Sequence, residues 1–218
     1  MNLFYTGLLS IAVSLLASLT IYFQRKDEFY LRLFPPFLLL TLLIEINSLF
    51  GLVSRKYTTP MYNIFSIVEF IFYLFILGLI VKNFRAKRII NYVVLVFGIF
   101  AVGNIIFFQK ISGFPSLNHA AGCLLIVGIC IYYFFELFQI PQSVPLVRQP
   151  SFWICSGLLF FYCCSFPIFT AINLLRTLPP FTIKTLVTII SILNVLLYSS
   201  FTIAFLCRLR TRNSTSLS

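Results

Sequence analysis

The sequence predicts an all-α membrane protein, a seven-transmembrane-helix bundle. Two compositional observations and one pattern support this prediction. Of the 218 residues, 60% are hydrophobic and only 10% are charged, whereas a soluble domain is about half apolar and about a quarter charged. The mean hydropathy is +1.02. The apolar residues are also gathered into seven runs, each with the ~20 residues that a helix needs to cross the hydrocarbon core of a bilayer.

The seven runs define the expected helices and the short connections between them. They cover roughly residues 3–23, 33–53, 60–82, 89–108, 118–138, 152–174 and 183–207. The connections are rich in turn-forming residues, as in "SRKYTTP" after the second run and "RTLPPF" after the sixth. We expect a single integral membrane domain over residues 1–218, ending in a short basic and polar tail at 208–218.

Each run has features that support its assignment. The first has no basic segment before it and no small-residue cleavage site after it, which favours a helix over a signal peptide. The second and third each carry one glutamate, and the fourth follows the basic segment "KNFRAKR". The fifth holds the only histidine, His119, the sixth opens with "PSFW", and the seventh ends before a basic tail. All seven runs are therefore expected to be transmembrane helices.

The basic residues predict the orientation of the bundle. Eleven of them follow the first, third, fifth and seventh runs, and these are Arg25, Lys26, Arg32, Lys82, Arg85, Lys87, Arg88, Arg148, Arg208, Arg210 and Arg212. Only five lie on the other side, namely Arg55, Lys56, Lys110, Arg176 and Lys184. Loops rich in Lys and Arg remain in the cytoplasm. The N-terminus is therefore predicted outside and the C-terminus in the cytoplasm, where the basic residues meet anionic lipid headgroups.

The net charge of +11 does not indicate a nucleic-acid partner, because the basic residues fall between hydrophobic runs and no basic groove motif accompanies them. The cysteines show no CxxC pair, and they read as small packing residues rather than as disulfides or metal ligands. They are Cys123, Cys130, Cys155, Cys163, Cys164 and Cys207. We expect no metal and no cofactor.

Enzyme chemistry is also not expected. Asp27 is the only aspartate and lies in a connection, which excludes aspartyl dyads. One histidine cannot supply a multi-histidine iron cluster. Neither GxSxG nor HExxH occurs. No catalytic residue is assigned.

Two glutamates inside apolar runs are the strongest candidates for function. Glu45 and Glu69 lie in the second and third runs, which a short connection joins, and we expect the two carboxyl groups at matching depth below the outer surface. A bare carboxylate at mid-bilayer costs at least about 2.5–3.5 kcal/mol. The two groups should therefore face the interior and be protonated, share a proton, bind a cation or reach water.

Polar residues at helical spacing accompany both glutamates and suggest an outward-facing polar pocket. Its candidate ligand- or cation-binding residues are Thr41, Glu45, Ser48, Tyr62, Ser66, Glu69, Tyr73, Asn194 and Tyr198. Asn104 and His119 lie toward the outer ends of the fourth and fifth runs and are expected nearby. An alternative stays open, because Ser, Thr, Asn, Tyr and neutral Glu residues also join membrane helices by hydrogen bonds of about 0.6 kcal/mol each. Glu136, at the cytoplasmic end of the fifth run, is expected to be structural and to reach either headgroup water or the basic loop after the third run.

Three stretches carry a resemblance to a known group of proteins. They are "PFLLL…IEIN", "MYNIFSIVEFIFY" and "PSFWICSGLLFFY". In these stretches the chain resembles small, largely uncharacterised seven-span membrane proteins of Bacteroidota-type bacteria. The resemblance implies a bacterial inner-membrane protein allied to signalling, and it implies no activity.

These observations lead to three alternative functions. The first is a sensor or receptor-like protein that signals through a separate membrane or cytoplasmic partner. The second is a small proton- or cation-coupled transporter or channel that uses Glu45 and Glu69. The third is a scaffold subunit of a membrane complex, and a homo-oligomer is compatible with each of the three.

Overall fold

The computed structural model describes residues 2–23, 28–51, 55–107, 116–139, 145–175 and 180–215. These residues are helical apart from short turns, and seven of the helical segments are long and apolar enough to cross a membrane. The chain is therefore an integral multi-pass membrane protein. Its elements are α1 (Asn2–Leu19), η1 (Thr20–Phe23), α2 (Phe29–Arg32), α3 (Phe34–Phe50), α4 (Arg55–Ile80), α5 (Phe84–Phe107), α6 (Ser116–Gln139), η2 (Leu146–Arg148), α7 (Pro150–Leu175) and α8 (Pro180–Thr215).

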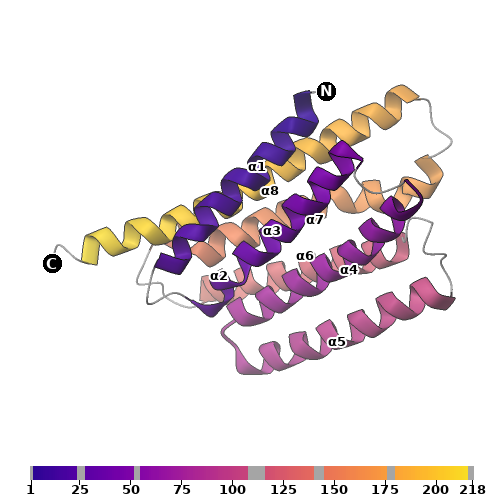
Figure 1. The fold of residues 1–218 in the computed structure, drawn as a ribbon. Helices are drawn as coiled ribbons and strands as arrows, with labels where there is room; N and C mark the ends of the chain where they lie inside the picture. Colours follow the sequence, from indigo (N-terminus) through magenta and orange to yellow (C-terminus); the bar gives the residue numbers. More distant parts are fainter. Residues whose placement is uncertain are drawn as a thin grey trace.

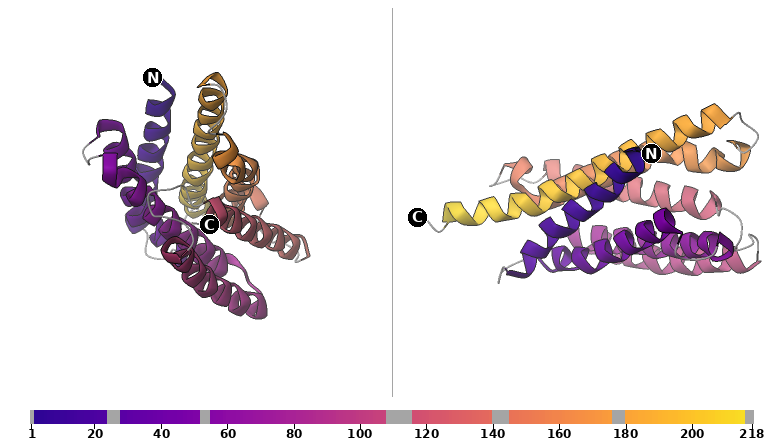
Figure 2. Two further views of the ribbon diagram at one scale, coloured as in Figure 1. Left: turned by 90° about the vertical axis from the view of Figure 1, so that its right-hand side faces the viewer. Right: turned by 45° about the horizontal axis from the view of Figure 1, so that its top comes forward.

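The helices form a bundle that does not follow chain order. Helix α1 packs against α3 and α8, α7 packs between α8 and α6, and α4 packs against α6 and α5. The end-on view shows these neighbours around the bundle, with α5 at its edge (Figure 2). Helix α4 is the most buried of the seven, whereas many large apolar side chains of α5, such as Ile99 and Ile106, are exposed as a lipid-facing surface requires. The first and last helices of the chain are thus neighbours.

The two ends of the bundle are named here after the chain terminus that lies at each. The N-terminus, the end of α3, the start of α4 and the start of α8 lie at one end, here called the N-terminal end, and the C-terminus lies at the other (Figure 1). The assignment of these ends to the outside and the cytoplasm stays a prediction. Several of the basic residues on which this prediction rests lie outside the described residues, among them Arg25, Lys26, Lys110 and Arg176.

Helix α4 begins earlier than expected. The segment "SRKYTTP" was expected to be a connection, but α4 starts at Arg55 and has Pro60 inside it. A proline beyond the first turn removes one backbone hydrogen bond and crowds the carbonyl four residues back, but the helix continues through Pro60. The preceding helix, α3, ends at Phe50, where Gly51 takes a left-handed conformation with φ 61° and its N–H bonds to the carbonyl of Asn47. The turn between α3 and α4 is therefore shorter than the sequence suggests.

The start of α5 shows why Glu136 is structural. The side-chain oxygen of Asn83 accepts the N–H groups of Arg85 at 2.9 Å and Ala86 at 3.4 Å, which caps the helix at Phe84, five residues before the expected start. The carboxylate of Glu136 on α6 accepts the N–H groups of Lys82 at 3.0 Å and Asn83 at 2.6 Å. The expected contact between Glu136 and the loop after the third span is thereby confirmed.

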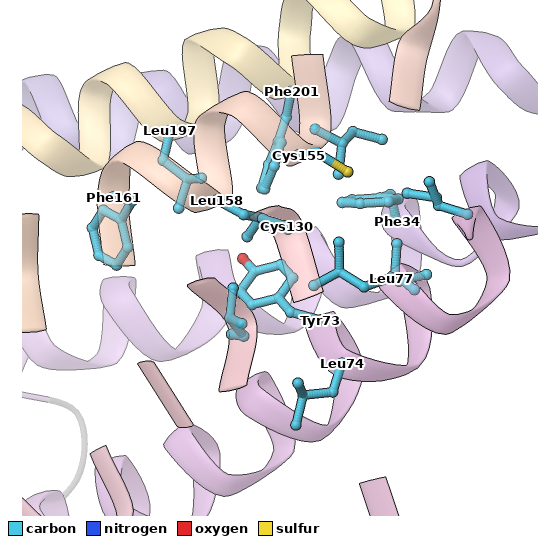
Figure 3. Packing of buried hydrophobic residues seen from close by; sticks show 14 of the residues in the cluster. Phe34, Tyr73, Leu74, Leu77, Cys130, Cys155, Leu158, Phe161, Leu197 and Phe201 are labelled. Carbon is cyan, nitrogen blue, oxygen red and sulfur yellow. The ribbon is translucent and has the colours of Figure 1, made fainter. Parts of the chain in front are cut away.

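The core is concentrated in the half of the bundle toward the C-terminal end. The ring of Phe34, at the start of α3, lies edge-on to Phe201 and Phe205 of α8 at centroid distances of 5.3 and 5.5 Å. Tyr73, Leu77, Cys130 and Cys155 gather around the same centre, together with Leu158 and Phe201 (Figure 3). None of the six cysteines, all of which lie in described segments, forms a disulfide, and Cys130 and Cys155 are buried. This half of the bundle is close-packed and mostly apolar.

Two glycines allow helices to approach closely. A Cβ atom at Gly122 of α6 would collide with the ring of Phe70 of α4, and one at Gly157 of α7 would lie 2.8 Å from the Cβ of Ser200 of α8. Small residues are typical of such contacts in membranes, where helix association depends on van der Waals packing. Gly122 thus permits the close contact of α4 with α6, and Gly157 permits that of α7 with α8.

Candidate functional site

A cavity of about 340 Å³ lies between α1, α3 and α8, in the half of the bundle toward the N-terminal end. Its lining consists of Gly7, Leu8 and Ile11 of α1, Glu45, Ser48 and Leu49 of α3, and Ser191, Asn194 and Tyr198 of α8. Ser48 is exposed, so the cavity is open on that side. The cavity is thus placed away from the close-packed apolar half.

Local sequence explains the shape of the cavity. Ser191, Asn194 and Tyr198 are spaced by three and four residues, which puts them on one face of α8. Glu45 and Ser48 are spaced by three residues and share a face of α3 in the same way. On α1, Gly7 has no side chain, and a Cβ atom built there would meet nothing within 4 Å. The glycine therefore leaves space that the two polar faces border.

The cavity has two chemically different walls. Helices α3 and α8 supply a carboxylate, hydroxyl groups and an amide, whereas Leu8, Ile11 and Leu49 supply aliphatic carbon. The hydroxyl group of Tyr62 on α4 lies within hydrogen-bonding range of Glu45 and Ser48. Of the nine predicted site residues, four line the cavity, namely Glu45, Ser48, Asn194 and Tyr198. A fifth, Tyr62, is outside the lining but lies within hydrogen-bonding range of Glu45 and Ser48.

The two glutamates do not lie at matching depth. Glu45 is level with Tyr62, and the neighbouring contact between α3 and α4 joins the amide of Asn47 to the sulfur of Met61 at 3.4 Å. Glu69 lies about two turns farther along α4, a rise of about 10 Å. The expectation of equal depth is wrong because α3 ends and α4 begins earlier than the apolar runs suggest.

Helices α3 and α4 also meet mainly through side chains rather than through close backbone approach. Phe37 of α3 stacks on Phe72 of α4 with a centroid distance of 3.8 Å, and it lies 6.2 Å from Phe65. These large rings hold the two helices apart. The antiparallel pair α3 and α4 is therefore joined through aromatic rings.

Glu69 belongs to a second polar group below the cavity. It lies within hydrogen-bonding range of Tyr162 of α7, and the carboxyl of Glu45 and the hydroxyl of Tyr198 are close enough to it for electrostatic interaction. Tyr198 lines the cavity, so this side chain connects the two groups. Tyr73 is also near, with its ring 6.0 Å from that of Tyr162, and its fully buried hydroxyl finds no hydrogen-bond partner among the described residues. The structure thus brings Glu69 and Tyr73 together beneath the cavity rather than in its lining.

Two predicted site residues bond to their own helices. The hydroxyl of Thr41 donates to the carbonyl of Phe37 at 3.0 Å, and that of Ser66 donates to the carbonyl of Asn63 at 3.0 Å. Neither lines the cavity. Inside a helix, the hydroxyl groups of Ser and Thr commonly donate to a backbone carbonyl of the preceding turn in this way.

Asn104 and His119 also lie elsewhere. The amide of Asn104 donates to Asn118 at 2.7 Å, and Asn118 donates to the carbonyl of Ala101 at 3.1 Å, which ties α5 to α6. The ring of His119 packs against Phe70 and Phe169, with centroid distances of 5.2 and 5.0 Å. Both residues therefore contribute to helix packing rather than to the cavity.

Sequence reasoning missed the wall that α1 supplies. Gly7, Leu8 and Ile11 carry no polar atom in their side chains, and apolar residues of a membrane helix can face lipid, core or cavity equally well. The one available signal was Gly7 itself, because a glycine in a membrane helix often marks a close approach or an open space. Ser191 was also not among the predicted site residues, although it lies three residues before Asn194 and so shares its helix face.

Among the side chains that the structure describes, no three His, Cys, Asp or Glu residues come together as metal ligands would. The chain matches no protein-family model, and neither the curated proteins nor the solved structures contain a significant match to it. The cavity and the polar group beneath it are therefore the basis for the function proposed below.

Proposed function

We propose that this protein is a receptor-like sensor of a bacterial inner membrane, with a cavity that faces outward and binds a small molecule. The observation that carries the proposal is the cavity itself, in which a carboxylate, an amide and hydroxyl groups converge beside an apolar wall. Small-molecule sites typically combine a mostly apolar lining with a few placed polar groups in a volume of about 300–1,000 Å³. The predicted orientation puts this cavity on the outer side.

Helix α8 provides a route from the cavity to a partner. It runs unbroken from Pro180 to Thr215, 36 residues, which is about 54 Å and exceeds the ~30 Å hydrocarbon core. Toward its C-terminal end, the thiol of Cys207 donates to the carbonyl of Val147 in η2 at 3.3 Å. A ligand that favours one position of α8 over another shifts the population of both ends of this helix. A separate partner at the cytoplasmic face would read that shift.

The test fills the cavity without disturbing the packing. In Gly7→Phe, the new side chain replaces a glycine of the cavity lining, and its Cβ meets nothing within 4 Å. The matched control is Gly128→Phe, at an exposed position on α6 whose Cβ also has no neighbour within 4 Å. Transcript profiles are compared between cells that carry the wild type, either variant, or a deletion of the gene. Gly7→Phe should resemble the deletion and Gly128→Phe the wild type; a wild-type profile for Gly7→Phe at normal protein level refutes the proposal.

A second candidate function is proton- or cation-coupled transport. The observation that favours it is the position of Glu69 beneath the cavity, within range of Glu45 and of the cavity-lining Tyr198. Two acidic groups at successive depths are the arrangement that a relay requires. In proteoliposomes with an imposed pH difference, transport would acidify or alkalinise the lumen with wild-type protein and would stop in Glu69→Gln. A flux equal to that of empty liposomes excludes this candidate and leaves the sensor.

A further inference from the structure

We infer that the cavity binds a small amphipathic cation, a molecule with an ammonium group and a short apolar body. This inference rests on the proposed binding function and specifies the class of ligand. It follows from the charge of the cavity, from the arrangement of its walls and from its size.

The charge of the cavity favours a cation. Glu45 is the only charged side chain among the described residues of the lining, and no Lys, Arg or His accompanies it there. In a membrane interior of low dielectric, an anion would be repelled by the carboxylate of Glu45, whereas a cation neutralises it. A neutral ligand would leave the carboxyl of Glu45 without an opposite charge.

The donors of an ammonium group match the acceptors on the polar wall. An ammonium carries three N–H donors and accepts none. The carboxylate of Glu45, the hydroxyl of Ser48 and the amide oxygen of Asn194 are available acceptors from two facing helices. Tyr62 supports Glu45 and Ser48 from α4 and so holds this part of the site in place. The ring of Tyr198 adds an aromatic surface, to which cations are attracted.

The opposite wall excludes a bare metal ion as the main ligand. Na⁺ and Ca²⁺ require oxygen ligands around most of their surface. On the α1 side the lining offers Gly7, Leu8 and Ile11, which have no side-chain oxygen. The same surface suits methylene or ring carbons, which would lie against Leu8, Ile11 and Leu49. A volume of about 340 Å³ holds an ammonium group with a short apolar body.

The experiment compares three probes of equal length and different charge. Purified protein in phosphatidylcholine nanodiscs is titrated with n-hexylammonium, 1-hexanol or hexanoate, and thermal unfolding is followed. A ligand that binds only the folded state raises the midpoint temperature, because it stabilises that state by RT ln(1 + c/Kd), where c is the concentration of free ligand. We expect hexylammonium to act at a concentration at least ten-fold lower than hexanol, and hexanoate to have no effect. The zwitterionic lipid prevents the cation from accumulating at the membrane surface.

Four variants locate the effect. Gly7→Phe should lose the response to every probe, whereas Gly128→Phe should keep it. Glu45→Gln should lose the ten-fold preference for the cation, and Glu45→Asp, which keeps the charge and guards against a misfolded Gln variant, should retain most of it. A ten-fold preference that survives Glu45→Gln would overturn the assignment of this residue.

The outcomes separate the ligand class from the proposed function. If hexanol or hexanoate acts as well as hexylammonium and Gly7→Phe abolishes the effect, the cavity binds ligands but the cationic class is wrong. If NaCl at the same concentration produces the same shift as hexylammonium chloride, a metal cation is the ligand and the inference is also wrong. If no probe raises the midpoint of the wild type beyond that of Gly7→Phe, both the ligand class and the binding function fail.

Discussion

Gly122 shows how a single atom sets the distance between two helices. The added Cβ of an alanine would lie 2.6 Å from Cε1 of Phe70, a separation that real Cβ atoms do not tolerate. We expect Gly122→Ala to lower the free energy of unfolding by about 1–3 kcal/mol, because overpacking forces rings and backbone to shift. The measurement is thermal or denaturant unfolding in detergent.

The control for that substitution is Gly128→Ala on the same helix. Its Cβ has no neighbour within 4 Å, and alanine favours a helix over glycine by about 1 kcal/mol. Stability should therefore stay equal or rise. Equal stability of both variants would show that α4 and α6 are farther apart than the structure indicates.

At the scale of residues, the sequence predicted polar members of the site and missed apolar ones. Glu45, Ser48, Asn194 and Tyr198 stand out because a polar group inside an apolar run must find a partner or water. Leu8 and Ile11 give no such signal, since their side chains suit lipid, core and cavity alike. Thr41 and Ser66 were grouped with the site by spacing alone, and their bonds to the helix backbone could not be read from spacing.

At the scale of helices, the register of α3 against α4 can be tested directly. Cysteines at Glu45 and Tyr62 should be joined by a short bifunctional reagent, because these side chains lie within hydrogen-bonding range. Cysteines at Glu45 and Glu69 should be joined much less efficiently, since they differ in depth by about 10 Å. A protease site placed between α3 and α4 reports the crosslink, because joined fragments stay together on a denaturing gel.

The protein without added cysteines gives the background from its six native thiols. If the pair at 45 and 69 reacts better than the pair at 45 and 62, the two glutamates lie at equal depth and the register described above is wrong.

Helix ends were the least predictable part of the elements. The apolar runs gave each helix correctly, but α4 and α5 both start five residues before the predicted position. At α4 the proline was read as a boundary although the helix continues past it. At α5 the cap is made by Asn83 and by a carboxylate from α6, a contact between distant parts of the chain that hydropathy does not contain.

At the scale of the whole molecule, the orientation can be tested by reporter fusions. A reporter that is active only in the cytoplasm should be active after Ser218 and inactive after Arg55, because basic residues are enriched on the side of the C-terminus. A fusion after Arg148 should be active and serves as an internal positive control. The reverse pattern would turn the cavity toward the cytoplasm and would refute an outward-facing sensor.

The sequence predicted the number of spans and their approximate limits, but not which helices are neighbours. Hydropathy measures whether a segment can cross a membrane, whereas the packing of α1 against α8 depends on contacts between the two ends of the chain. The cavity arises from that packing, since α1 and α8 each supply one side of it.

The apolar half of the bundle is also a barrier to ions. Phe34, Phe201 and Phe205 close the centre between the cavity and the C-terminal end, and Leu77 is fully buried beside them. An ion that left the polar groups in that direction would enter hydrocarbon-like surroundings at a cost of several kcal/mol. This aromatic layer therefore prevents protons from leaking through the bundle, so the protein does not dissipate a proton gradient across the membrane. The aromatic layer thus separates the cavity from the C-terminal end in the described part of the bundle, as the proposed sensor function requires.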